Sequence, residues 1–117
     1  MAALDPHLRG ADRVREVFAR VRRGDDSVAD LYAEDGVVVT GSTRVEGRAA
    51  IRAFYRATID AIHPQPAVTV VLQSAESSCY AAVVEVPNDR GHVHALDLFT
   101  IDDEGIRQLE IFNRTLD

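Results

Sequence analysis

The stretch "HVHALDLFTIDDEGIRQLEIFN", residues 92–113, alternates apolar and polar side chains on both sides of an acidic turn that ends in glycine. A period of two residues is typical of a β-strand, and so short a connection joins antiparallel neighbours. We therefore predict adjacent antiparallel strands over 92–101 and 106–113. Asp97 is the exception to the pattern, because it stands where the alternation requires an apolar residue.

The rest of the chain divides into a helical first half and a strand-rich second half. Apolar residues at three- and four-residue steps predict helices from Asp5-Pro6 to Gly24, over 26–32 with Asp26 or Ser27 as cap, and from Arg48 to just before Pro64. A short strand is expected at 36–41, a loop at 42–47, and further strands at 67–75 and 78–86. This order predicts an α+β domain whose helices cover one face of an antiparallel sheet.

The "PNDRG" connection fixes which side chains share a face. If 88–91 form the loop, Glu85 pairs with His94 and Ala82 with Asp97. The two faces then hold Tyr80, Ala82, Val84, Val93, Ala95, Asp97, Phe99 and Ile101 on one side, and Cys79, Ala81, Val83, Glu85, His92, His94, Leu96 and Leu98 on the other. Both are largely apolar, so we expect helices on the first and a second copy of the chain, forming a homodimer, on the second.

Composition excludes several classes of function. A chain of 117 residues with 46% hydrophobic content predicts one domain over 1–117. The net charge is −6 and the basic residues are dispersed, which argues against nucleic acid or anionic lipid as partner. All thirteen basic residues are arginine, so no lysine can form a Schiff base or bind a phosphate. With no glycine-rich nucleotide motif, we expect no cofactor.

The remaining compositional signals concern location and the single cysteine. Charges interrupt the N-terminal residues and no apolar run approaches the roughly 20 residues that span a bilayer, so we expect a cytoplasmic protein without membrane segments. Cys79 has no partner for an internal disulfide and is expected to be a small buried strand residue.

Few residues could carry chemistry. His92 and His94 form an H-x-H pair, but alternation sends Asp97 to the opposite face and leaves only Glu85 nearby, so we expect a polar pair and no metal site. Tyr32 and Tyr55 fall on buried helical stripes, where core packing is the simplest role. Asp97 must either meet an arginine, such as Arg48 or Arg52 of the third predicted helix, or stay protonated because burial disfavours its charge.

Three segments together resemble the SnoaL-like and ketosteroid-isomerase-like branch of the nuclear transport factor 2-like superfamily. They are "DLYAEDGVVVTG" (30–41), "VEGRAAIRAFYRATID" (45–60) and "LDLFTIDDEGIRQLEIF" (96–112). The resemblance implies a single SnoaL-like domain, in which a curved antiparallel sheet packs on three N-terminal helices as a cone. It also implies a pocket at the open end of the cone and dimers through the outer sheet face.

The same resemblance assigns roles to individual residues. Asp97 matches the protonated aspartate that donates a hydrogen bond to the oxyanion in ketosteroid isomerases; this acid's raised pKa is a standard example of burial. Tyr32 and Tyr55 match tyrosines that support the oxyanion, and Asn113 would point into the pocket. The isomerase base falls at Thr40, which is no base. The pocket-lining set that we expect is Val17, Phe18, Thr40, Tyr80, Ala82, Phe99 and Ile111.

Two functions follow from these residues. One is a cofactor-independent acid–base enzyme of isomerase or cyclase type, acting on a small apolar carbonyl compound through Asp97, Tyr55, Tyr32 and Asn113. The other is a non-catalytic module that uses the same cone to bind a hydrophobic molecule or a partner. The position of the isomerase tyrosine, which falls at about Val17 beside Phe18, and Thr40 at the base position favour the second.

Overall fold

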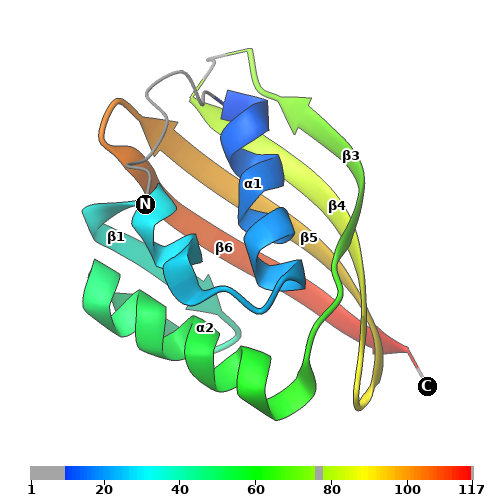
Figure 1. Cartoon of the computed structure of the whole chain (residues 1–117). Coiled ribbons are helices and arrows are strands. Elements are labelled where there is room, and N and C mark those ends of the chain that lie inside the picture. The colour runs from blue at the N-terminus through cyan, green and yellow to red at the C-terminus, as the bar shows by residue number, and fades with distance from the viewer. Residues whose placement is uncertain (1–9, 76–77, 117) are drawn as a thin grey trace.

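The computed structural model describes residues 10–75 and 78–116 of the chain and shows helices packed on one curved sheet (Figure 1). The elements are α1 (Gly10–Arg22), the 3-10 helix η1 (Asp26–Leu31), β1 (Tyr32–Thr40), β2 (Thr43–Glu46), α2 (Arg48–Ile62), β3 (Ala67–Gln73), β4 (Cys79–Asn88), β5 (Gly91–Asp102) and β6 (Gly105–Leu116). No helix in the described part of the chain is long and apolar enough to cross a membrane.

The six strands are ordered β2-β1-β6-β5-β4-β3, so the second half of the chain forms a meander. Every neighbouring pair is antiparallel except β1 and β6, which run parallel and are separated along the chain by β2, α2 and strands β3 to β5. Figure 1 shows α1 lying across the concave face of the sheet and α2 below it, beside β1. The predicted α+β cone of a curved sheet on three helices is confirmed.

The predicted register of β4 and β5 is also confirmed. Pro87 pairs with His92, Glu85 with His94 and Ala82 with Asp97. The turn is tighter than expected, because the strand pairing continues through residues 88 and 91 and leaves two residues in the connection. The inner face is buried, as the strand alternation requires, and the outer face leaves large apolar side chains exposed.

Four local predictions are wrong. Residues 43–46 lie in the predicted loop but form β2, because the positive φ of Gly41 (+58°) allows a tight hairpin with β1. The cap of η1 is Asp25 instead of Asp26 or Ser27: the Asp25 side chain accepts a hydrogen bond from the Ser27 amide at 2.9 Å. Tyr32 begins β1 instead of ending the helix. Cys79 is exposed, since it lies on the outer face. The predicted Asp5-Pro6 helix start lies outside the described residues.

Apolar stripes of the helices meet the inner face of the sheet. Val14 and Val17 of α1 and Ile51 of α2 are fully or almost fully buried, as the 3.6-residue period predicts. Phe99 of β5 lies beneath α1 and meets the ring of Phe18 edge to face, with centroids 6.0 Å apart. This ring contact packs α1 directly onto β5.

Candidate functional site

A cavity of about 210 Å³ opens between α1, α2 and the inner face of the sheet. Strands β1, β4, β5 and β6 form its floor, and the segment after α2 forms its rim. Its lining is almost entirely apolar and consists of Val17, Phe18, Val21, Thr40, Phe54, Tyr55, Thr58, Ile59, Ile62, Pro64, Pro66, Val86, Asn88, Val93, Ala95, Asp97, Leu109, Ile111 and Asn113. Such a cavity suits a small molecule with few polar groups.

Most of the residues expected at the site border this cavity. Those that line it are Val17, Phe18, Thr40, Tyr55, Asp97, Ile111 and Asn113. Tyr80, Ala82 and Phe99 do not line it, although all three are buried on the inner face. Tyr80 lies beneath the start of α1, where its hydroxyl would be 2.2 Å from a Cβ at Gly10. Helix α1 therefore fills the part of the cone above these residues.

Asp97 is the buried carboxyl of the cavity. Its side chain is 5% exposed, and its Oδ1 has no hydrogen-bond partner among the described residues. Burial raises the pKa of Asp97 from 3.8 to about 7, because an apolar surrounding disfavours the ionised carboxylate. The acid is therefore divided between its protonated and ionised forms near neutral pH.

The arginines considered as partners of Asp97 make other contacts. Arg48 donates to the backbone oxygen of Tyr32 at 2.8 and 3.1 Å. Arg52 forms ion pairs with Asp26 and Asp30 of η1 at 3.0 and 2.5 Å. These contacts fasten α2 to η1 and the start of β1, and they leave Asp97 without an ion pair in the described part of the molecule. Of the two expectations for this residue, desolvation is the one the structure supports.

Two buried tyrosines lie close enough to Asp97 for its charge to affect their ionisation. The hydroxyls of Tyr32 and Tyr55 are 2.6 Å apart, and Tyr55 lines the cavity while Tyr32 lies behind it, fully buried. Burial raises the pKa of both hydroxyls, and an ionised Asp97 raises them further. Both phenols are therefore protonated at neutral pH. If Tyr32 donates to Tyr55, the Tyr55 hydrogen is left to point at a ligand.

Polar groups are spread from the floor of the cavity to its rim. Asp97 and Tyr55 are buried, whereas Asn113 on β6 is exposed. Asn88, also on the rim, already uses both of its amide atoms, because it donates to Val86 and accepts from the Arg90 amide. A ligand would thus place one oxygen deep, near Asp97 and Tyr55, with Asn113 at the entrance.

Sequence reasoning missed one wall of the cavity. That wall comes from α2 and the segment after it, and consists of Phe54, Thr58, Ile59, Ile62, Pro64 and Pro66. The helical stripe that carries Phe54, Thr58 and Ile62 was visible in the sequence, and it is on the same face as Tyr55. Extending the predicted site along that stripe would have found the part of the wall that α2 contributes.

Comparison with known families and structures identifies the same group. The SnoaL-like domain model matches residues 14–109. No curated protein sequence matches the chain. A protein from Sinorhizobium meliloti, provisionally described as a polyketide cyclase, superposes with a TM-score of 0.79 at 24% identity, over 88% of this chain and 95% of its own.

Two further solved structures share the fold. The epoxide hydrolase/cyclase-like enzyme SalBIII, described in pyran ring formation of the polyether salinomycin, has a TM-score of 0.78 at 23% identity and 88% coverage of both chains. A steroid delta-isomerase from Pseudomonas aeruginosa has a TM-score of 0.73 at 17% identity, over 91% of this chain and 80% of its own. The resemblance drawn from the three sequence segments is confirmed.

Proposed function

Because this chain belongs to the SnoaL-like domain family, we propose that it is a cofactor-independent acid–base enzyme of isomerase or cyclase type. The observation that carries the proposal is Asp97, a buried carboxyl with a pKa of about 7 on the floor of an apolar cavity. General acid–base catalysis works best when the pKa of the catalytic group lies near the operating pH. Solved structures of similar fold include a cyclase-like enzyme and an isomerase.

The arrangement supports a mechanism with a single proton carrier. The ionised Asp97 removes a proton from the carbon next to a carbonyl, and the electron pair moves onto the carbonyl oxygen. The Tyr55 hydroxyl donates a hydrogen bond to that oxygen, while Tyr32 holds Tyr55 in place. Protonated Asp97 then returns the proton to another carbon, which completes an isomerisation. In a cyclisation the enolate carbon would instead attack a second carbonyl of the substrate, and Asp97 would return its proton to the alkoxide that forms.

The volume of the cavity limits the substrate. A cavity of about 150 Å³ accommodates benzene, so one of about 210 Å³ admits a single substituted ring with a carbonyl group. A four-ring steroid would protrude far beyond the rim. We therefore propose a small monocyclic or open-chain carbonyl compound as the substrate, with its apolar body against Phe54 and Ile62.

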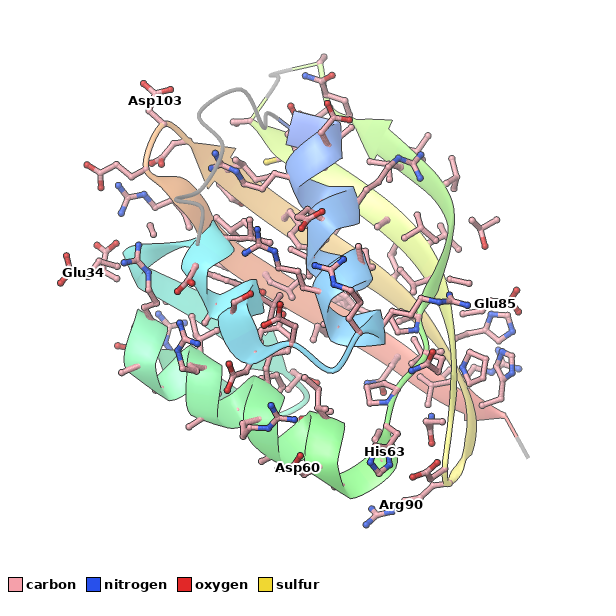
Figure 2. All side chains as sticks on the ribbon, in the orientation of Figure 1. Glu34, Asp60, His63, Glu85, Arg90 and Asp103 are labelled. Carbon is pink, nitrogen blue, oxygen red and sulfur yellow. The ribbon has the colours of Figure 1, made fainter. Side chains whose placement is uncertain are left out.

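The test uses cyclohex-3-enone, whose rearrangement to the conjugated enone needs only the proton transfer described above. We expect the wild-type protein to accelerate the absorbance change, and the rate to rise with pH up to about 7, since the base form is the ionised one. Asp97→Asn should lower the rate about 100-fold or more. Asp103→Asn is the matched control, because Asp103 is exposed on the β5–β6 turn, away from the cavity (Figure 2).

A second candidate function is binding of a hydrophobic molecule without chemistry. The nearly complete apolar lining favours it, as do Thr40 and Val17 at the positions that carry a base and a phenol in ketosteroid isomerases. Equal rates for wild type and Asp97→Asn, together with saturable quenching of a dye bound in the cavity, would support this function and contradict the enzymatic one.

The proposal extends to assembly and location. Large apolar side chains are exposed in two neighbouring cross-strand rows of the outer face. One row contains Val70, Leu96 and Phe112, and the next contains Leu72 and Leu98. We propose that a second copy covers this face, forming a homodimer in the cytoplasm. Light scattering should give twice the chain mass for wild type and one chain mass for Leu96→Glu. A monomeric wild type would contradict the dimer.

A further inference from the structure

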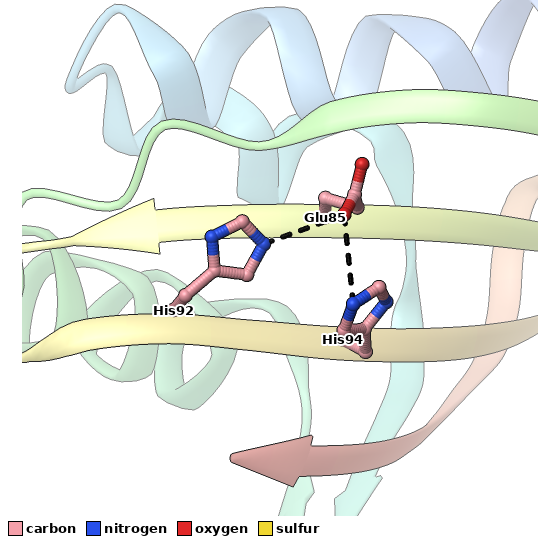
Figure 3. Close-up of side chains that lie close together, drawn as sticks. All are labelled: Glu85, His92 and His94. Atoms are coloured by element: carbon pink, nitrogen blue, oxygen red, sulfur yellow. Dashed lines mark ion pairs between the residues drawn. The ribbon is translucent and has the colours of Figure 1, made fainter. Parts of the chain in front are cut away.

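Three ligating side chains meet on the outer face of the sheet, opposite the cavity. Glu85 of β4 lies directly across from His94 of β5, and His92 precedes His94 by two residues on the same face. Figure 3 shows both imidazole rings turned toward the Glu85 carboxylate. The Nε2 atoms of His92 and His94 are each 3.5 Å from the same oxygen, Oε1 of Glu85.

These distances suit a shared metal ion. A tetrahedral zinc ion with bonds of about 2.0–2.2 Å holds its ligand atoms about 3.4 Å apart. Two of the three separations in the cluster already have nearly that length, and all three ligand atoms lie within 4.8 Å of one another. The third separation, between the two imidazole nitrogens, changes with rotation of the His94 ring, which is exposed.

The cluster also contains a buried nitrogen that makes no hydrogen bond among the described residues. Nε2 of His92 is shielded from solvent and makes no hydrogen bond within the described residues. Burying an imidazole nitrogen without a hydrogen bond costs free energy, and coordination of a metal ion by that nitrogen would offset the cost. The strand pairing holds the three side chains in place, so little backbone rearrangement is required to bind the ion.

We propose that Glu85, His92 and His94 form a binding site for a zinc-class divalent cation. Two imidazole nitrogens and one carboxylate oxygen are ligands that zinc accepts, and three protein ligands leave a coordination position for water. The site is separate from the Asp97 cavity, because the two clusters occupy opposite faces of β4 and β5. It therefore does not depend on the chemistry proposed for the cavity, although it shares the outer face with the proposed dimer, in the row next to Val83 and Leu96.

Titration calorimetry of zinc chloride into the untagged, chelator-treated full chain tests the site. We expect one zinc ion per chain. His94→Ala and Glu85→Gln should each weaken binding about 10- to 100-fold or more, since even loss of a residue that only supports a ligand has that effect. Circular dichroism would show that these surface variants remain folded.

The matched control is His63→Gln. His63 also contacts a carboxylate, with Nδ1 2.5 Å from Oδ2 of Asp89, but this pair offers one imidazole instead of two. Zinc affinity should be unchanged in this variant. Arg114→Ala sharpens the test, because Arg114 is the β6 neighbour of His94 by register and its positive charge disfavours a cation; zinc should bind more tightly.

A spectroscopic measurement reports ligation directly. Cobalt(II) added in place of zinc should give visible absorption of a four-coordinate ion in wild type and His63→Gln. Absence of this band in wild type, or zinc binding equal in wild type and in the double variant His92→Ala/His94→Ala, would overturn the proposal. A loss of both signals only in the variants of the three proposed ligands would support it.

Discussion

The two faces of the β4–β5 pair hold carboxyl groups in opposite environments. On the inner face, Asp97 is 5% exposed and its carboxyl lies in an apolar cavity. On the outer face, the cross-strand carboxylate Glu85 is half-exposed and lies between two imidazoles. The two carboxyls belong to adjacent strands, and Ala82, the partner of Asp97, is only three residues from Glu85. Strand alternation alone separates them.

The difference shows how burial sets the behaviour of a carboxyl group. Asp97 keeps its proton to about pH 7 because water cannot solvate its charge, and no cation in the described part of the chain replaces water. Glu85 remains accessible to water and to cations. The inner acid is therefore suited to proton transfer, and the outer one to binding a cation.

The largest expected effect is on the pH dependence of stability. Between pH 4 and 7 the unfolded chain releases the Asp97 proton while the folded chain retains it, so stability falls as pH rises and stays low above pH 7. Asp97→Asn cannot lose stability in this way, so its unfolding free energy relative to that of wild type should rise by up to about 4 kcal/mol between pH 4 and pH 8. Urea denaturation at several pH values measures it.

An ionised Asp97 held by an unseen cation would reverse that result. Asp97→Asn would then be less stable than wild type at pH 8. A parallel series on Asp103→Asn controls for the loss of one negative charge, because Asp103 is exposed and lies far from the cavity.

The glycines that begin β5 and β6 offer a smaller contrast. Gly105 and Gly91 both have positive φ, at +125° and +138°, but a Cβ at Gly105 would lie 2.9 Å from backbone atoms of Ala33 and Leu31, whereas none would meet a Cβ at Gly91. Gly105→Ala should cost about 3 kcal/mol and Gly91→Ala about 1 kcal/mol of unfolding free energy. Equal losses would show that the close approach at Gly105 carries no cost.

Removal of a cavity hydroxyl should have a more moderate effect. Tyr55→Phe leaves the buried Tyr32 hydroxyl without its partner, which should cost about 1–3 kcal/mol of stability. The double variant Tyr32→Phe/Tyr55→Phe removes both hydroxyls and should recover part of the loss. Thermal denaturation measures both. A double variant less stable than Tyr55→Phe alone would contradict a cost of leaving the Tyr32 hydroxyl without a partner.

The smallest effect is expected on the outer face. Glu85→Gln removes a half-exposed charge, and without metal it should change the unfolding free energy by no more than about 0.5 kcal/mol at pH 8. Urea denaturation in the presence of chelator is the measurement. A loss comparable to that of Gly105→Ala would mean that the two imidazole contacts stabilise the fold themselves.

Much of the fold could be predicted from local patterns. The period-two alternation and the acidic-glycine turn placed β5 and β6, and the "PNDRG" connection gave the register that brings Ala82 opposite Asp97. Strand β2 was missed because four exposed or half-exposed residues carry no apolar alternation, and its pairing depends on the turn at Gly41. Likewise the parallel contact of β1 with β6 joins distant segments and has no local signal.

The candidate site was predictable only in part. Asp97 was marked by its place in an apolar pattern, since a charged group there needs a physical reason. The volume beside it depends on where α1 crosses the sheet, which covers Tyr80 and leaves Asn113 at the rim. The convergence of His92 on Glu85 was missed because adjacent pairs were considered and the diagonal neighbour was not.

The most direct test of the central claim is the pKa of Asp97 itself. Carbon-13 NMR of the side-chain carboxyl, assigned by its absence in Asp97→Asn, follows its ionisation from pH 3 to pH 9. The account predicts a midpoint near pH 7, well above the ordinary value for an aspartate of 3.8. A midpoint at or below the ordinary value of 3.8 would contradict it, because the carboxyl would then be an ion-paired structural group instead of a proton carrier.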